Sequence, residues 1–184
     1  AFYSDFQDYQ LESTVGFSAT GDPIIEIDNV DSARSYGLEL SFDARPIDDL
    51  AIFGALGLLK TEITSFSSSA DRSVIGNELL RAPSTTFTLG ADYQISDRFT
   101  IGGAIRYSSS FFNDKENTRA GASDSFLVGD LRASYEHEYG KVFAYVKNVT
   151  DATYALDPQD DGTGTLSSSL GAPREIGVGL RLEW

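Results

Sequence analysis

Apolar side chains recur at every second position along much of this 184-residue chain, and that alternation restricts its possible folds more than any other feature. It is clearest in the C-terminal stretch REIGVGLRLEW (174–184) and in TTFTLGADYQI (85–95). Successive side chains of a β-strand point to opposite faces, so a period of two indicates strands with one apolar and one polar face. The sequence therefore predicts an all-β fold built from two-faced strands.

Eight segments are predicted as strands. They lie at roughly 1–14, 23–45, 50–64, 82–96, 99–112, 125–137, 141–155 and 172–184. Segments 50–64 and 141–155 carry apolar residues on both faces, so the alternation does not fix their orientation.

The connections between these strands alternate between short and long. The short ones are 46–49, 96–98 and 138–140, and the long polar ones are 15–22, 65–81, 113–124 and 156–171. This alternation is typical of an antiparallel up-and-down meander with all short turns on one side, as in outer-membrane barrels.

Charged residues occupy the polar faces, where a soluble sandwich could not bury them without partners. They are Glu39, Asp43, Arg45, Asp92, Arg106, Asp130, Arg132, Glu175 and Arg181. In a transmembrane barrel such faces line a polar lumen while the apolar faces meet lipid. A soluble antiparallel sheet with one wet face shows the same alternation. The loop lengths favour the barrel, as do aromatic residues placed where a periplasmic belt would lie, at Phe42, Tyr93, Phe99, Tyr135 and Trp184.

Composition narrows the range of partners. The net charge of −14 argues against a nucleic-acid partner, because phosphate binding needs clustered Lys and Arg. The chain has no Cys, which excludes disulfides and thiolate metal sites, and no cofactor or metal site is predicted. It also has no Met, so we expect a processed form or a piece of a longer chain.

Two C-terminal stretches, KNVTDATY (147–154) and GAPREIGVGLRLEW (171–184), resemble the end of the barrel of TonB-dependent outer-membrane receptors. The matching residues are Asn148, Val149, Thr150, Asp151 and Tyr154 in the first motif, and Gly171, Pro173 and Arg174 in the second. The segment 29–50 also resembles a strand pair of the family, through Ala33, Tyr36, Gly37 and Glu39. One departure is Trp184, where Phe is commoner in the family.

The resemblance implies a plugged barrel of roughly 22 strands, of which residues 1–184 would be the C-terminal portion with the plug domain absent. It implies a Gram-negative outer-membrane receptor for TonB-dependent uptake of a scarce solute, most often a ferric siderophore, and no enzyme. The implied partners are outer-membrane lipid and lipopolysaccharide, the barrel-assembly machinery, a small-molecule ligand, and the TonB complex through the missing N-terminal part. The alternatives are a small self-contained barrel, acting as an adhesin or a structural protein, and a soluble β-domain that binds a ligand.

The long loops are the predicted ligand-facing surface, since loops on a rigid scaffold carry recognition. The candidate contacts are Phe111, Phe112, Arg119 and Tyr154. Arg106, Arg132 and Arg181 are instead predicted to pair with acids in the lumen.

The family motifs are predicted to shape strand ends. Asn148 and Asp151 are turn formers, and Pro173 suits a strand start because it has no N–H to donate. Gly177 and Gly179, on the inner face, would leave room for the contents of the lumen.

Two other groups are predicted to do no chemistry. His137 lies between Glu136 and Glu138, but neighbouring residues of a strand point to opposite faces, which disfavours a metal site. Asp157, Asp160 and Asp161 lack the spacing of a calcium loop and are read as a solvated acidic loop.

The terminal strand yields the first testable prediction. In outer-membrane proteins such a strand is also the signal read by the assembly machinery, and the resemblance implies that role for Ile176, Val178, Leu180, Leu182 and Trp184. Deletion of Trp184 should therefore reduce the amount of receptor inserted in the outer membrane more than it weakens ligand binding per inserted molecule. Quantifying folded receptor in membrane fractions tests this, and normal insertion after loss of both Trp184 and Leu182 would contradict it.

Overall fold

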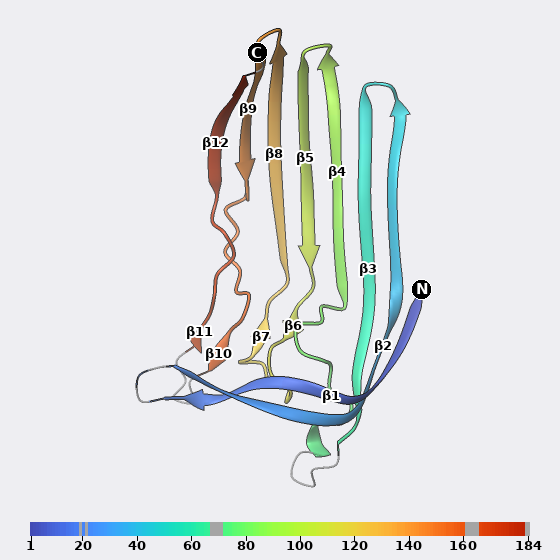
Figure 1. Cartoon of the computed structure of the whole chain (residues 1–184), viewed down its shortest axis with the longest axis vertical. Coiled ribbons are helices and arrows are strands. Elements are labelled where there is room, and N and C mark those ends of the chain that lie inside the picture. The colour runs from blue at the N-terminus through green and yellow to red at the C-terminus, as the bar shows by residue number, and fades with distance from the viewer. Residues whose placement is uncertain (19, 21, 67–71, 161–165, 183–184) are drawn as a thin grey trace.

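The computed structural model describes the whole chain except residues 19, 21, 67–71, 161–165 and 183–184. In the described part, eight strands form one antiparallel sheet in which each strand pairs with the next main strand along the chain (Figure 1). They are β1 (Phe2–Phe17), β2 (Pro23–Ile47), β3 (Leu50–Ser65), β4 (Thr85–Ser96), β5 (Phe99–Ser108), β8 (Phe126–His137), β9 (Gly140–Lys147) and β12 (Glu175–Leu182). The predicted all-β meander is confirmed, and the described sheet is open because β1 and β12 are its edges.

Short elements lie within the long connections. They are the strand pairs β6 (Phe111–Phe112) with β7 (Ala122–Ser123) and β10 (Gln159–Asp160) with β11 (Leu166–Ser167), and the 3₁₀ turn η1 (Arg72–Val74). Residues 109–112, predicted to end the fifth strand, instead leave the sheet and supply β6. Among the described residues, no helix is long and apolar enough to cross a membrane.

The seventh strand ends earlier than predicted, at Lys147 and not near residue 155. Asn148 follows it with a φ of 47°, a left-handed conformation that cannot continue a strand. The last strand also starts later than predicted, at Glu175. The carbonyl of Ala172 accepts a hydrogen bond from the side chain of Asn148 and takes no part in a strand ladder. Both prediction errors therefore have the same cause, the conformation and bonding of Asn148.

The connections alternate in length as the sequence predicts. The turns β2–β3, β4–β5 and β8–β9 lie at one end of the sheet, where the last strand also finishes (Figure 1). The long connections lie at the opposite end, called the loop end below (Figure 1). In the β8–β9 turn, Gly140 has a φ of 140°, which side chains rarely tolerate.

Cross-strand partners share a face, so the register assigns each strand an outer and an inner side. Leu89 pairs with Ile105 on the apolar outer face, and Thr88 pairs with Arg106 on the polar inner face. The register also settles the two strands whose orientation the alternation left open. Their inner-face residues are Ala51, Phe53, Ala55 and Gly57 in β3, and Lys141, Phe143, Tyr145 and Lys147 in β9.

Aromatic side chains form a belt on the outer face at each end of the strands. The predicted belt at the short turns consists of Phe42, Tyr93, Phe99 and Tyr135; Trp184 lies outside the described residues. A second belt, which the sequence analysis did not predict, lies toward the loop end. There Tyr3 stacks on Tyr36 at 6.2 Å between ring centroids, and Phe87 stacks on Tyr107 at 5.2 Å. Two belts flanking an apolar band are typical of transmembrane barrels.

Ion pairs cross between neighbouring strands on the inner face. They are Arg132–Asp92 at 2.5 Å, Arg106–Asp130 at 3.1 Å, Lys141–Glu136 at 3.0 Å and Lys147–Glu175 at 3.3 Å. The predicted pairing is thus confirmed for Arg106 and Arg132. Arg181 also lies on the inner face, opposite Lys141, but forms no ion pair within the described part of the chain.

Aromatic rings on the inner face lie over glycines of the next strand. A Cβ on Gly179 would fall 2.2 Å from the ring of Phe143, and one on Gly177 would fall 2.4 Å from the ring of Tyr145. The room that these glycines were predicted to leave for the lumen is therefore filled by β9. Any larger residue at either position would displace a ring. Glycine at both positions therefore allows β9 and β12 to pack closely on the inner face.

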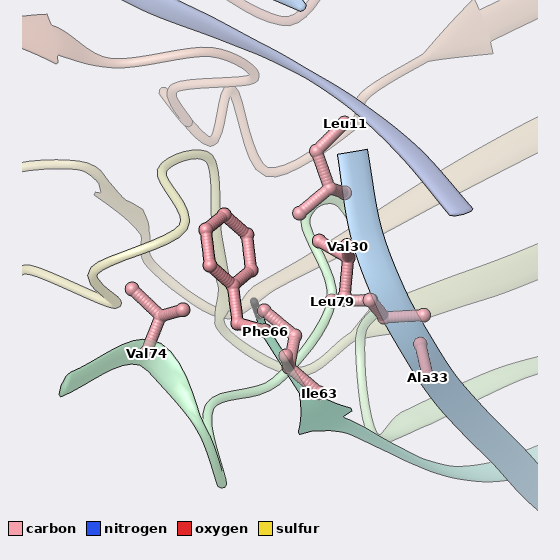
Figure 2. Close-up of a cluster of buried hydrophobic side chains, with 7 residues drawn as sticks. All are labelled: Leu11, Val30, Ala33, Ile63, Phe66, Val74 and Leu79. Carbon is pink, nitrogen blue, oxygen red and sulfur yellow. The ribbon is translucent and has the colours of Figure 1, made fainter. Parts of the chain in front are cut away.

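The buried apolar cluster of the described residues lies at the loop end (Figure 2). Its members are Leu11, Val30, Ala33, Ile63, Phe66, Val74 and Leu79. Between the belts the sheet is a single layer whose outer side chains remain exposed, such as Leu131 at 52% and Val178 at 76%. A face of this kind needs an apolar surrounding such as lipid.

The contact between Phe143 and Gly179 gives a direct test of the packing at the last strand pair. Gly179→Ala should destabilise the folded barrel by about 1–3 kcal/mol, because the new methyl group overlaps the ring. In a Phe143→Ala background the same change should cost much less. The measurement is the temperature at which the folded gel band of each variant disappears, and equal losses in both backgrounds would show that the ring is not the cause.

Candidate functional site

Asn148 is the centre of a hydrogen-bonded structure that holds the ends of three strands together. The residue is 5% exposed. Its side-chain Nδ2 donates to the carbonyls of Ala152 and Ala172, at 2.9 and 3.0 Å, and Oδ1 accepts from the Ala152 N–H at 2.9 Å. Its backbone N–H donates to the Asp130 carboxylate of β8 at 2.9 Å. Asn148 therefore joins β8, the exit from β9 and the approach to β12.

Asp151 and Arg174 connect the same loop at a second point. The Arg174 backbone N–H donates to the Asp151 carboxylate at 3.1 Å, and the guanidinium lies 2.8 Å from its other oxygen. That backbone hydrogen bond, followed by the side-chain bond and the charge of Arg174, lowers the pKa of Asp151 below its usual value. Asp151 has a φ of 55°, a conformation that Asp and Asn tolerate better than most residues.

Tyr154 packs within this structure. Its ring stacks on Phe126 of β8 at 4.1 Å between centroids and covers Gly171, where a Cβ would fall 2.0 Å from the ring. The Gly171 N–H donates to the Tyr154 carbonyl at 2.9 Å. Pro173 lies just before β12, where its missing N–H breaks no ladder hydrogen bond. We call this set, Asn148, Asp151, Tyr154, Gly171, Pro173 and Arg174, the strand-exit clamp.

The long loops after β3, β5 and β9 are bonded to one another at the loop end. Asn117 donates to the Glu78 carbonyl at 3.1 Å and accepts from the Glu78 N–H at 2.7 Å. Asn77 donates to the Lys115 carbonyl at 2.8 Å, which adds a third bond between the loops after β3 and β5. Arg81 pairs with Asp157 of the loop after β9 at 3.2 Å. The loops therefore form one connected surface.

The predicted ligand contacts lie in different parts of this surface. Phe111 and Phe112 are half-buried in β6, and the Phe112 carbonyl accepts from the Arg81 N–H at 2.8 Å. Arg119 is exposed in the turn between β6 and β7. Tyr154 instead borders a hollow of about 410 Å³ on the inner face of the sheet. Phe126, Thr86, Thr88 and Arg106 also line this hollow. Their role as ligand contacts stays a prediction.

His137 lies on the strand end at the short turns, where its ring is 5.4 Å from that of Tyr139. Its neighbour Glu136 points to the inner face and pairs with Lys141, so the two side chains diverge. The described residues include no group of three or more His, Asp or Glu side chains that could hold a metal ion. Of the acidic loop, Asp161 lies outside the described residues.

Sequence reasoning missed the residues that organise the loop between β6 and β7. The two carboxylate oxygens of Asp114 accept from the N–H and hydroxyl of Thr118, at 2.9 and 2.8 Å, and Asn117 has a φ of 54°. Asp, Asn and Thr at such spacing are a turn signal, but the bonds to the neighbouring loop depend on tertiary structure and have no signature in sequence.

An open antiparallel wall with an apolar outer face, two aromatic belts, an ion-paired inner face and connected loops at one end is part of an outer-membrane β-barrel. Residues 1–149 match the family described as TonB dependent receptor-like, beta-barrel. The chain belongs to this family of Gram-negative outer-membrane receptors.

Solved structures of such receptors share the fold over nearly the whole chain. The siderophore receptor PiuA from Acinetobacter baumannii is 19% identical, with a TM-score of 0.74 over 97% of this chain and 24% of that one. The ferric yersiniabactin uptake receptor FyuA from Yersinia pestis is 16% identical, with a TM-score of 0.79 over 99% and 26%. The copper transporter OprC is 19% identical, with a TM-score of 0.71 over 98% and 27%. This chain thus spans about a quarter of the length of each.

The bond between Asp151 and Arg174 predicts a pH-dependent stability. Because the folded state lowers the pKa of this carboxyl, its contribution is present above the ordinary aspartate pKa and is lost as pH falls through the lower folded value. Asp151→Asn keeps an acceptor for the Arg174 N–H but removes the charge. The variant should therefore be less heat-stable than the parent at pH 6, and the difference should vanish in acid.

Thermal melts of the folded gel band between pH 3 and pH 6 measure this difference. Asp124→Asn, at an exposed aspartate in the neighbouring loop, is the control and should leave the melting temperature unchanged. A gap between Asp151→Asn and the parent that persists unchanged in acid would contradict the assigned role of the charge.

Proposed function

We propose that this chain is the C-terminal part of the barrel of a TonB-dependent receptor that imports a scarce solute, with a ferric siderophore or a similar iron complex as its ligand. The observation that supports this most strongly is the match of the receptor barrel family over residues 1–149. PiuA and FyuA, which are described as a siderophore receptor and a ferric yersiniabactin uptake receptor, support the ligand class. The copper transporter OprC shares the fold, so the fold alone does not select the metal.

The work of the protein in this proposal is binding and selective passage, without covalent chemistry. The wall contributes a rigid inner face whose charges are largely paired. The connected loops would supply the ligand contacts, Phe111, Phe112 and Arg119. An aromatic surface and a guanidinium suit a chelate with flat rings or carboxylate groups, because Arg binds anions through charge-assisted hydrogen bonds. The family is one of transport receptors and not of enzymes.

The remaining proposed partners are assigned to other surfaces. Lipid and lipopolysaccharide would cover the outer face between and above the aromatic belts. The barrel-assembly machinery would read the exposed outer residues of β12, which are Ile176, Val178, Leu180 and Leu182 at 57–76% exposure. The TonB complex would act through the plug and the N-terminal segment, outside this chain.

Deletion of the gene should slow growth and uptake of ferric iron from chelates under iron limitation, and loss of the TonB system should do the same. Uptake of radioactive iron presented with individual siderophores identifies the ligand. Unchanged iron uptake together with reduced copper uptake would replace the iron assignment with a copper one. Unchanged uptake of every metal complex tested would contradict the proposed ligand class.

The loop contacts can be tested separately. Arg119→Ala should weaken binding of the identified chelate about tenfold, the amount expected for one charge-assisted hydrogen bond. Arg98→Ala is the matched control, because Arg98 is an exposed arginine at the opposite, short-turn end. Equal affinity of the parent and Arg119→Ala would remove this residue from the proposed site.

A further inference from the structure

The inner face is hollowed near the short turns, at the end of the sheet opposite the loops. This hollow has a volume of about 540 Å³ and extends over β5, β8, β9 and β12, which are neighbours in the sheet. It shares no lining residue with the hollow that Tyr154 borders. Its charged and aliphatic hydroxyl side chains are those of Asp92, Thr100, Arg132, Ser134, Lys141 and Arg181. We call it the turn-end hollow.

The shape of the turn-end hollow follows from the sizes of the side chains along its strands. Thr100 and Ser134 are register partners in the middle of it. Arg132 lies one inner-face row from them toward the loop end, and the register pair of Lys141 and Arg181 lies one row from them toward the short turns. The two flanking rows are thus four residues apart, roughly 13 Å along the strands. Short hydroxyl side chains between two rows of long side chains leave the space open.

The lining of this hollow is positively charged, although the chain as a whole has a net charge of −14. It contains three cationic side chains and one carboxylate, that of Asp92. Arg132 already binds this carboxylate through two hydrogen bonds, of 2.9 and 2.5 Å. The pair reaches across Gly102, where a Cβ would fall 2.0 Å from the Asp92 carboxylate. The remaining positive charge of the lining is that of Lys141 and Arg181.

Lys141 and Arg181 lie directly opposite each other on neighbouring strands, a position in which like charges repel. Lys141 is paired on its other side with Glu136, at 3.0 Å. Within the described part of the chain, Arg181 forms no ion pair, and the hydroxyls of Thr100 and Ser134 form no hydrogen bond. Guanidinium and ammonium groups only donate hydrogen bonds, and a hydroxyl can donate one. The hollow therefore offers positive charge and several donors to an anion, which would also relieve the repulsion between the two cations.

We propose that the turn-end hollow is a binding subsite for a compact small molecule that carries two or more carboxylate groups. One carboxylate binds between Lys141 and Arg181, because a guanidinium pairs with a carboxylate through two parallel hydrogen bonds. A second binds the donors of Arg132 that Asp92 does not use, and the two hydroxyls contact the middle of the molecule. The biological role of the subsite rests on the proposed receptor function: it would hold a carboxylate-bearing solute at the short-turn end of the inner face before release.

The test is equilibrium dialysis of radiolabelled citrate, used as a probe tricarboxylate, against the complete receptor purified in detergent. The parent should bind citrate saturably, and Arg181→Gln should weaken binding about tenfold or more, because a hydrogen bond to a charged group is lost. Ser134→Leu should abolish this binding with every charge intact, since the larger side chain fills the hollow, whereas Ser134→Ala should retain it. Acetate and inorganic phosphate should compete about tenfold less well than citrate, because neither carries two carboxylate groups.

Arg45→Gln is the matched control, because Arg45 is an exposed arginine at the same end of the sheet, on β2, and does not line the hollow. It should leave the affinity for citrate at the parental value, and heat-modifiable gel migration shows whether each variant is folded. Equal affinities of the folded parent and Arg181→Gln, or equal losses in the Arg181 and Arg45 variants, would overturn the subsite.

A carboxylate side chain from the part of the receptor outside this chain has the same chemistry as the proposed ligand. If such a side chain fills the hollow, the parent binds no citrate and Arg181→Gln lowers the melting temperature of the folded gel band. That result would overturn a small-molecule subsite. Because dialysis measures binding without transport, the proposed import function stands or falls separately, by the growth and uptake experiments.

Discussion

The fold depends on the pairing of backbone N–H and C=O groups between neighbouring strands. In the hydrocarbon part of a membrane no water is present to bond an unpaired group, so a spanning sheet must satisfy its backbone internally. Each main strand of this protein therefore pairs with its neighbour over the region between the two aromatic belts. Side chains are left with only two environments, lipid on one side and the lumen on the other. The alternation in the sequence is a direct consequence of this constraint.

Beyond the aromatic belts the backbone groups no longer have to pair within the sheet, and the strands give way to irregular structure. Strands end in left-handed residues such as Asn148, loops bond to one another, and β1 and β2 form a ribbon without a third strand. The backbone can be solvated in this region, so stability has to come from side chains. The apolar cluster around Ile63 stabilises the loop end by burying apolar side chains. The clamp around Asn148 stabilises the strand ends by hydrogen bonds.

The features that a membrane imposes on a sheet could be predicted from the sequence. The features that depend on tertiary contacts could not. The strand count of the sheet, the side of each turn and the belt at the short turns follow from periodicity and aromatic placement. The left-handed conformation of Asp8 in β1, with a φ of 52°, could not be predicted, because residues on either side of it continue a strand-like pattern and an aspartate marks no particular conformation. Likewise, Val149 and the residues after it look like strand, and only the buried side chain of Asn148 ends the ladder. The ligand contacts have no comparable periodic signal.

The motif residues that carry the resemblance to the receptor family are thus mostly the ones that build the wall. Asn148, Asp151 and Gly171 are occupied by bonds within the clamp, and such bonds serve equally well for any cargo. PiuA, FyuA and OprC share the fold with this chain at 16–19% identity, although their descriptions name different cargoes. The proposed ligand contact Arg119, by contrast, is exposed and takes no part in the clamp.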